Sequence, residues 1–340
     1  MVRTEAGRRP AVAAARLIES GPTSGSADGA TLPLILIAGP TGSGKSALAM
    51  AIAEVFSGVV INADAMQIYR ELRILTARPT ADDEARVPHR LYGVLSAADP
   101  CSAGRWRPLA LTAIEEARAM GRLPVVVGGT GLYLRALVHG LAEVPTIPAA
   151  IHREAERRHR ALGGAGFRAD LAALDPAAAA RLPAGDTQRL IRAWEVVQAT
   201  GRTLADWQAD AAPAPLAGRR TTLLLLPPRD WLYPALDARF ERMLAEGALD
   251  EAATLRHLPP QLPAMKAVGV RQLMTHIRGE SSLGEACATA KRETRRYAKR
   301  QMTWLRHQMQ GDAVIDEQFS ERVQPKLFAF IRRFLLTVAA

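Results

Sequence analysis

The sequence predicts an α/β protein with a doubly wound parallel sheet and an inserted helical domain. Three observations predict this class. Residues 39–46 read GPTGSGKS and follow an apolar run. Strand-like runs then alternate with helical patterns at the spacing of βαβ units. Between about residues 147 and 217 the chain is rich in Ala and Arg, helical in pattern and without a convincing strand.

The GPTGSGKS stretch fits the P-loop pattern G-x-x-x-x-G-K-[ST] and makes the fold P-loop NTPase-like. Its glycines let backbone N–H groups turn toward phosphate oxygens, and the following helix adds its positive dipole end. Lys45 adds a mobile charge, and the Ser46 hydroxyl can ligate Mg²⁺, the one cofactor that we expect. The candidate diphosphate- or nucleotide-binding residues are Gly39, Pro40, Thr41, Gly42, Ser43, Gly44, Lys45 and Ser46.

Apolar runs predict strands, and helical patterns lie between them. The expected strands are Leu34–Ala38, Gly58–Ile61, Val125–Val127 and Thr222–Leu226, with helices such as Ser46–Phe56 and Pro108–Met120. In a sheet of this kind, ligands bind at the carboxyl ends of the strands. The stretches expected there are the P-loop, NADAMQIY (62–69) and GGTGLYL (128–134).

Composition suggests the domain boundaries. Residues 1–30 lack a clear period, which predicts a disordered extension. The α/β core is expected over 31–146 and 218–318, the helical insert over 147–217, and a C-terminal helix over 319–340.

The charge distribution favours an acidic partner. The net charge is +10, from 44 Lys and Arg against 34 Asp and Glu. In residues 291–306, Arg292, Arg295, Arg296 and Lys299 fall on one helical face, and 153–160 and 188–192 add basic sites. With the P-loop, this predicts a polyphosphate substrate and a nucleic acid. Two cysteines suit a reducing cytoplasm, and no apolar run reaches membrane-spanning length, so no membrane partner is expected.

Asp64 is the carboxylate expected beside the P-loop. The strand in LPVVVGGT ends without an acid, although a P-loop NTPase normally has one there for Mg²⁺. Asp64 follows the second strand instead. It could hold Mg²⁺ through water, act as a base toward a second substrate, or form a structural Asx turn.

Seven motifs in order resemble the tRNA dimethylallyltransferases, also called tRNA isopentenyltransferases, of bacterial type. They are GPTGSGKS, NADAMQIYRELRILTARPT, PHRLYGVLSAADPCSAGRW, GRLPVVVGGTGLYLRAL, DTQRLIRAWEV, KAVGVRQLM and YAKRQMTWLR. The resemblance spans about Leu34 to Asp316. It implies transfer of a dimethylallyl group from dimethylallyl diphosphate to N6 of the adenosine 3′-adjacent to a tRNA anticodon, with release of diphosphate. The P-loop would then hold an isoprenoid diphosphate.

The resemblance also implies roles for single residues. Asp64 matches the catalytic base, Thr41 and Arg239 the residues that contact the diphosphate, and Thr130 a residue near the substrate channel. The tRNA-binding positions that it implies are Asp64, Ala65, Met66, Gln67, Thr130, Arg153, Gln188, Arg189, Leu190, Ile191, Arg192, Lys266, Ala267, Val268, Gly269, Val270 and Arg271. Gln67 could pair with an adenine edge. We expect the partners to be a tRNA anticodon stem-loop and dimethylallyl diphosphate, and the protein to act as a monomer.

The sequence departs from the family's usual residues at Ala65, Leu75, Arg78, Ala235 and Val270. Two other functions share some of these features. A nucleotide or small-molecule kinase would have the same loop and sheet, and a non-catalytic RNA-binding protein would have the same basic insert.

Overall fold

The computed structural model describes residues 18–19, 32–210, 215–216, 218–317, 319–320 and 322–337. Their centre is a seven-stranded sheet with the strand order β1-β7-β6-β2-β5-β3-β4. The strands are β1 (Ile18–Glu19), β2 (Leu34–Ala38), β3 (Gly58–Asn62), β4 (His89–Arg90), β5 (Leu123–Gly128), β6 (Arg220–Leu225) and β7 (Ala313–Ile315). All neighbours pair in parallel except β1 and β7.

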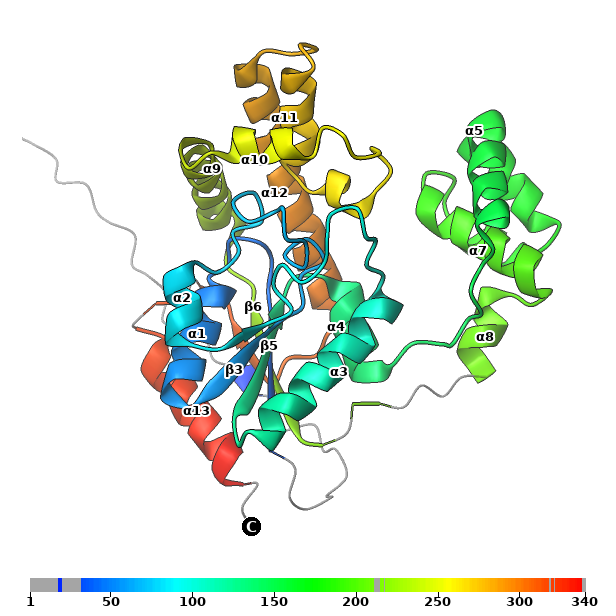
Figure 1. The fold of residues 1–340 in the computed structure, drawn as a ribbon. Helices are drawn as coiled ribbons and strands as arrows, with labels where there is room; N and C mark the ends of the chain where they lie inside the picture. Colours follow the sequence, from blue (N-terminus) through cyan, green and yellow to red (C-terminus); the bar gives the residue numbers. More distant parts are fainter. Residues whose placement is uncertain are drawn as a thin grey trace, which may run out of the picture. The chain divides into compact units, whose positions relative to one another are not determined.

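Helices cover both faces of the sheet (Figure 1). On one face lie α1 (Lys45–Val55) and α13 (Gln324–Leu336), whose apolar side chains share a core with the central strands. On the other face lie α3 (Ala103–Ala119) and α4 (Gly131–His139), joined by stacked Trp106 and Tyr133. β2, β3 and β5 are buried along their whole length, as continuous apolar runs of parallel strands require.

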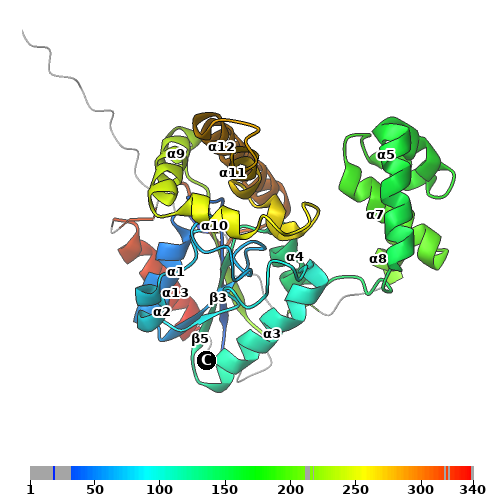
Figure 2. The ribbon, with the colours of Figure 1, turned by 45° about the horizontal axis from the view of Figure 1, so that its top comes forward.

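A second group of helices gathers at one end of this core (Figure 2). It consists of α9 (Arg229–Ala245), α10 (Ala248–Thr254), the 3₁₀ turn η1 (Pro263–Lys266), α11 (Val270–Ile277) and α12 (Leu283–Gln308). The short α2 (Ala81–Arg86) precedes β4. α12 begins with a capping box, in which Ser282 and Glu285 satisfy each other's backbone N–H groups.

The chain divides into two compact units, and the smaller one comprises His139–Leu216. Its helices are α5 (Ala149–Ala172), α6 (Pro176–Arg181), α7 (Thr187–Thr200) and α8 (Leu204–Asp210). It has its own core, in which Phe167 and Leu190 are fully buried and Trp194 nearly so. It starts before the expected boundary at 147 because residues 140–148, which carry no regular structure, group with it.

The predicted parallel sheet is confirmed, and three short strands were not predicted. β1, β4 and β7 have only two or three residues, too few for a period to be visible. The extension predicted for 1–30 lies outside the described residues apart from Ile18–Glu19, which form β1 rather than disordered chain. For the helix expected over 319–340, the described residues of that stretch show α13 at Gln324–Leu336. No helix in the described part of the chain combines the length and apolarity needed to cross a membrane.

Candidate active site

The P-loop joins β2 to α1 at the carboxyl edge of the sheet. Gly42 and Gly44 have φ values of 79° and 86°, which side-chain-bearing residues rarely adopt. A Cβ on Gly39 would lie 2.9 Å from the carbonyl oxygen of Leu225 on β6. The loop therefore needs glycine both for its left-handed turns and for its close approach to the neighbouring strand.

Lys45 points its ammonium group back across the loop. Its Nζ donates a hydrogen bond of 3.2 Å to the carbonyl oxygen of Pro40. Burial lowers the pKa of Lys45 from 10.5 to about 8, the negative charge of Asp64 opposes this shift, and Arg239 adds to it. Lys45 is therefore a partly buried cation without an ion-pair partner among the described residues, which favours a bound anion.

We expect the affinity for inorganic diphosphate to fall as the pH rises through about 8. Below this value Lys45 is protonated and attracts the anion, and above it the charged fraction falls by about tenfold per pH unit. Calorimetric titration between pH 7 and 9.5 would measure this. Because diphosphate itself can change protonation over this range, Lys45→Ala serves as the reference. The ratio of wild-type affinity to variant affinity should shrink as the pH rises. A ratio that is constant over this range would contradict the assignment.

Arg239 on α9 reaches the same loop. Its Nη2 donates a hydrogen bond of 2.6 Å to the hydroxyl of Thr41. Burial lowers the pKa of Arg239, while Asp64 acts in the opposite direction. Lys45 of the P-loop, Asp64 after β3 and Arg239 on α9 therefore share one electrostatic environment, although they come from three separate segments.

Asp64 follows β3 and is held by its neighbours. The buried Asn62 accepts the Asp64 N–H at 2.8 Å and donates to the Asp64 carbonyl oxygen at 3.0 Å. The carboxylate Oδ1 accepts the Met66 N–H at 2.9 Å, so an Asx turn is present. This bond uses one oxygen and leaves Oδ2 to accept a proton. The structural interpretation and the catalytic one are thus compatible, because each can use a different carboxylate oxygen.

The turn after β5 completes this edge of the sheet. Thr130 Oγ1 accepts the Ala65 N–H at 2.9 Å, which ties the turn to the Asp64 segment. The absence of side chains at Gly128 and Gly129 allows close packing. A Cβ on Gly128 would lie 2.1 Å from the Ala63 carbonyl oxygen, and one on Gly129 would lie 2.9 Å from the Gly39 carbonyl oxygen.

The inner face of α12 contributes residues that the sequence analysis did not assign to this site. Gln301 is only 6% exposed; its Oε1 accepts the Thr41 N–H and its Nε2 donates to the Gly129 carbonyl oxygen, both at 2.9 Å. Trp304 lies against Gly131, and Tyr297 hydrogen-bonds to Thr130. Burial raises the pKa of Tyr297, and the Asp64 charge adds to the rise. The spacing 297, 301, 304 is one helical face, a signal that the sequence did contain.

Gln67 and residues 266–271 both contact the loop that follows Gln67. Gln67 Nε2 donates to the carbonyl oxygens of Thr76 and Ala77, at 2.9 and 3.0 Å. Leu75 packs against Gly269, where a Cβ would lie 2.7 Å from it. In 266–271, Lys266 and Arg271 are exposed, whereas Ala267, Gly269 and Val270 are buried and can offer a partner little more than backbone.

The remaining candidate tRNA-binding residues lie in the smaller unit. Arg153, Gln188 and Arg189 are exposed, and Arg192 pairs with Glu195 at 2.8 Å. Leu190 is fully buried, so its side chain packs in the unit's core rather than meeting a partner. Ile191 is partly buried against the same core.

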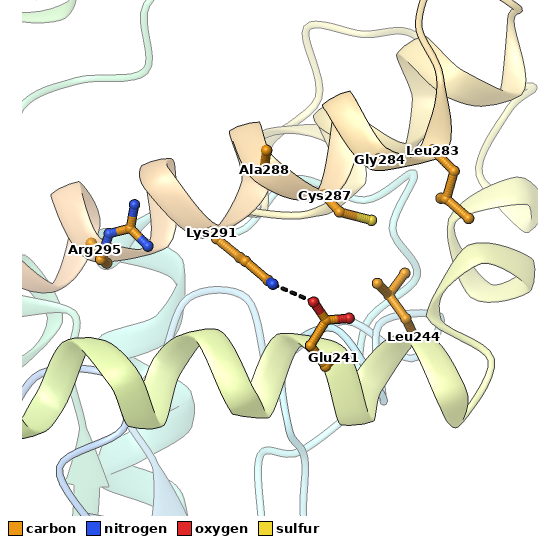
Figure 3. Close-up of a pocket in the computed structure, with 8 residues that line it drawn as sticks. All are labelled: Glu241, Leu244, Leu283, Gly284, Cys287, Ala288, Lys291 and Arg295. Carbon is orange, nitrogen blue, oxygen red and sulfur yellow. Dashed lines mark hydrogen bonds and ion pairs between the residues drawn. The ribbon is translucent and has the colours of Figure 1, made fainter.

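The basic face predicted on residues 291–306 is interrupted by acidic residues of α9. Arg295 pairs with Asp237, and Lys291 pairs with Glu241 beside a cleft of about 550 Å³ between α9 and α12 (Figure 3). These two cations therefore join helices. Arg292 and Lys299 remain exposed, so the face is less positive than the sequence pattern indicates.

Among the described residues, no group of three or more His, Cys, Asp or Glu side chains could hold a metal ion. A metal at the P-loop would therefore take most of its ligands from a phosphorylated substrate and water. The exposed hydroxyl of Ser46, on the first turn of α1, fits this arrangement. Mg²⁺ commonly keeps several waters and binds through substrate phosphates.

Fold and site together define a P-loop α/β enzyme in which a carboxylate, that of Asp64, interacts electrostatically with the cations at the phosphate loop. The IPP transferase family model matches residues 67–308, and the isopentenyl transferase model matches 32–96. The chain is 57% identical to the tRNA dimethylallyltransferase of Rhodospirillum centenum over 283 residues, covering 82% of this chain and 90% of that one. For the Rhodospirillum rubrum enzyme the identity is 53%, with 91% and 97% covered.

Solved structures of similar fold come from the same kind of transferase. The tRNA isopentenylpyrophosphate transferase of Bacillus halodurans matches with a TM-score of 0.64 and 31% identity, over 90% of this chain and 98% of that one. A eukaryotic dimethylallyltransferase acting on tRNA matches with a TM-score of 0.69 and 26% identity, over 81% and 70%. The chain belongs to the tRNA dimethylallyltransferase family and is a prenyltransferase that modifies tRNA.

Proposed function

We propose that this enzyme transfers the dimethylallyl group of dimethylallyl diphosphate to N6 of the adenosine 3′-adjacent to the anticodon, releasing diphosphate. The observation that supports it best is the Asp64 carboxylate at the same edge as Lys45 and Arg239. A proton acceptor thus stands beside cations suited to a diphosphate leaving group. In a kinase, a base at this position would be useful only if the hydroxyl that accepts the phosphoryl group bound in the same place.

The diphosphate would bind to the backbone N–H groups of the P-loop, to Lys45 and to Arg239, with Thr41 held by Arg239. As the bond between the allylic carbon and the diphosphate oxygen breaks, negative charge grows on that oxygen. Fixed donors stabilise it without reorganising. When bound at Ser46, Mg²⁺ would supply further positive charge to the leaving group.

The adenine amine is a poor nucleophile because its lone pair is delocalised into the ring. In our proposal Asp64 Oδ2 accepts the N6 proton as the N6–carbon bond forms, and Oδ1 keeps its bond to the Met66 N–H. The base must leave the anticodon-loop stack to reach this edge. Ala65, Met66, Gln67 and Thr130 would surround it.

The test is incubation of the full-length protein with labelled dimethylallyl diphosphate and unmodified tRNA. We expect label on N6 of that adenosine, with diphosphate released in equal amount. ATP turnover without labelled tRNA would support a kinase instead. tRNA binding without either reaction would support a non-catalytic RNA-binding protein. We also propose that the enzyme acts as a monomer in the cytoplasm, which size-exclusion chromatography with light scattering and cell fractionation would test.

Replacing Arg189 and Arg192 together with alanine should weaken tRNA binding at low salt more than it lowers turnover at saturating tRNA. Both arginines belong to the smaller unit, and in our proposal they contact backbone phosphates, which carry no sequence information. The salt slope should fall by roughly 0.7–0.9 per lost phosphate contact. Lys326→Ala with Arg332→Ala, which removes two exposed cations from α13, is the matched control. Wild-type affinity and slope with lost turnover would instead assign these arginines to the chemistry.

A further inference from the structure

Residues 73–78 form a single tight turn next to the active-site edge. The N–H groups of Ala77 and Arg78 donate to the carbonyl oxygens of Ile74 and Arg73, at 2.9 and 3.0 Å. Ala77 has a φ of 51°, a left-handed conformation like that which ends many helices. The turn therefore has the polarity of a short helix, with free N–H groups at one end and free carbonyl oxygens at the other.

Glu251, from α10, binds the N–H end of this turn. Its Oε2 accepts the N–H groups of Arg73 and Ile74, at 2.7 and 2.6 Å, and its Oε1 accepts that of Leu75 at 2.8 Å. One carboxylate thus satisfies three consecutive backbone donors from a segment about 176 residues away. Charge-assisted bonds of this kind are stronger than neutral ones.

Gln67 binds the carbonyl end of the same turn. Its Nε2 donates to the carbonyl oxygens of Thr76 and Ala77. The amide nitrogen is therefore engaged, and Oε1 is the atom that can accept a hydrogen bond from an adenine amino group. The orientation of the Gln67 amide depends on where the turn holds those two carbonyl oxygens.

The turn also touches the second stretch expected to meet tRNA. Leu75 is 7% exposed and packs on Gly269, whose φ of 100° brings the backbone close. Leu75 also donates its backbone N–H group to Glu251. Loss of the hydrogen bonds to Glu251 would therefore disturb both the Gln67 amide and the contact of Leu75 with Gly269.

We propose that Glu251 is a positioning residue for recognition of the target base, acting through the 73–78 turn on Gln67. The inference rests on the proposed function, because it takes Gln67 to meet the target adenine. In the described part of the chain, no hydrogen bond or ion pair joins Glu251 to Thr41, Lys45 or Arg239 of the P-loop network. Its effect should therefore fall on the tRNA and spare the diphosphate.

The test is a double-mutant cycle with Glu251→Gln and Gln67→Ala, measured by prenyl transfer to an anticodon stem-loop. Glutamine keeps the shape but presents an N–H₂ group to one of the three backbone donors. We expect KM for the stem-loop to rise by about tenfold, since a hydrogen bond to a charged group is lost, with KM for dimethylallyl diphosphate unchanged. Added to Gln67→Ala, the Glu251 change should cost little more. Full multiplication of the two effects would overturn the inference.

Asp250→Asn is the matched control, because it removes the same charge from the adjacent, exposed position of α10. Hydrogen exchange of the peptide covering 71–78, without substrate, should speed up in Glu251→Gln and not in Asp250→Asn. An unchanged exchange rate in both variants would overturn the inference that Glu251 holds the 73–78 turn in place. If the wild type itself transfers no label, the proposed function fails and this inference falls with it. Transfer by the wild type with independent mutant effects overturns the positioning role alone.

Discussion

Replacing Asp64 with alanine is expected to lower the single-turnover rate of prenyl transfer by about 10²-fold or more, the lower end of typical general-base contributions. The affinity for tRNA should change little, because the side chain supplies one carboxylate at the active-site edge. Asp64 lies where the charges of Lys45 and Arg239 are felt, and its Oδ2 is left to accept a proton. Rapid-quench kinetics with saturating substrates would measure the chemical step.

Asp64→Asn separates the two roles of this side chain. The asparagine Oδ1 can still accept the Met66 N–H and keep the Asx turn, but the amide cannot take up the N6 proton. We therefore expect Asp64→Asn to be about as slow as the alanine variant. A wild-type-like rate for asparagine with a slow alanine variant would make the turn, and not the base, the reason for this residue. Asp82→Asn, an exposed change on α2, is the control.

The sequence predicted those parts of the fold that arise from local pattern. The P-loop glycines, the apolar strands that bracket them and Asp64 at the end of β3 are each visible within about ten residues of chain. Because the carboxyl ends of parallel strands lie at one edge of the sheet, local pattern was also enough to predict that Asp64 and the P-loop lie at the same edge. The glycines of GGTG were visible as a motif, but the reason for them lies in distant segments, since a side chain there would collide with Ala63 or with α12.

Other parts depend on contacts between distant segments, which no single stretch reveals. Gln301 bonds Thr41 across 260 residues, and Glu251 bonds the 73–75 backbone across 176 to 178. Both are polar residues in helices with many polar neighbours. The spacing 297, 301, 304 places Gln301 on one helical face, but the segment alone does not show that this face meets the P-loop, and Glu251 has no comparable pattern. The same limit explains the basic face of α12. The positive charge of this helix, from which the sequence analysis predicted an acidic partner, is balanced in part by Asp237 and Glu241 of α9.

Replacing Lys45 with alanine should weaken binding of dimethylallyl diphosphate and slow the chemical step, together by about 10²–10³-fold in kcat/KM. This is the range seen when one preorganised donor to a developing oxyanion is removed. Lys45 is suited to such a role because it is partly buried, and burial lowers its pKa, so an arriving diphosphate meets a cation that water solvates less well than one on the surface. Steady-state kinetics with dimethylallyl diphosphate as the varied substrate would measure the effect.

Lys45→Met distinguishes charge from packing, because methionine fills similar space without the ammonium group. We expect it to be as impaired as Lys45→Ala in kcat/KM. Its melting temperature should be equal to that of the wild type or higher. The reason is that burial lowers the pKa of Lys45, so that at neutral pH the folded state bears the cost of a desolvated charge that methionine lacks. Lys326→Ala, an exposed change on α13, controls for net charge. An unchanged rate and an unchanged dependence on dimethylallyl diphosphate in both Lys45 variants would mean that the loop holds another ligand.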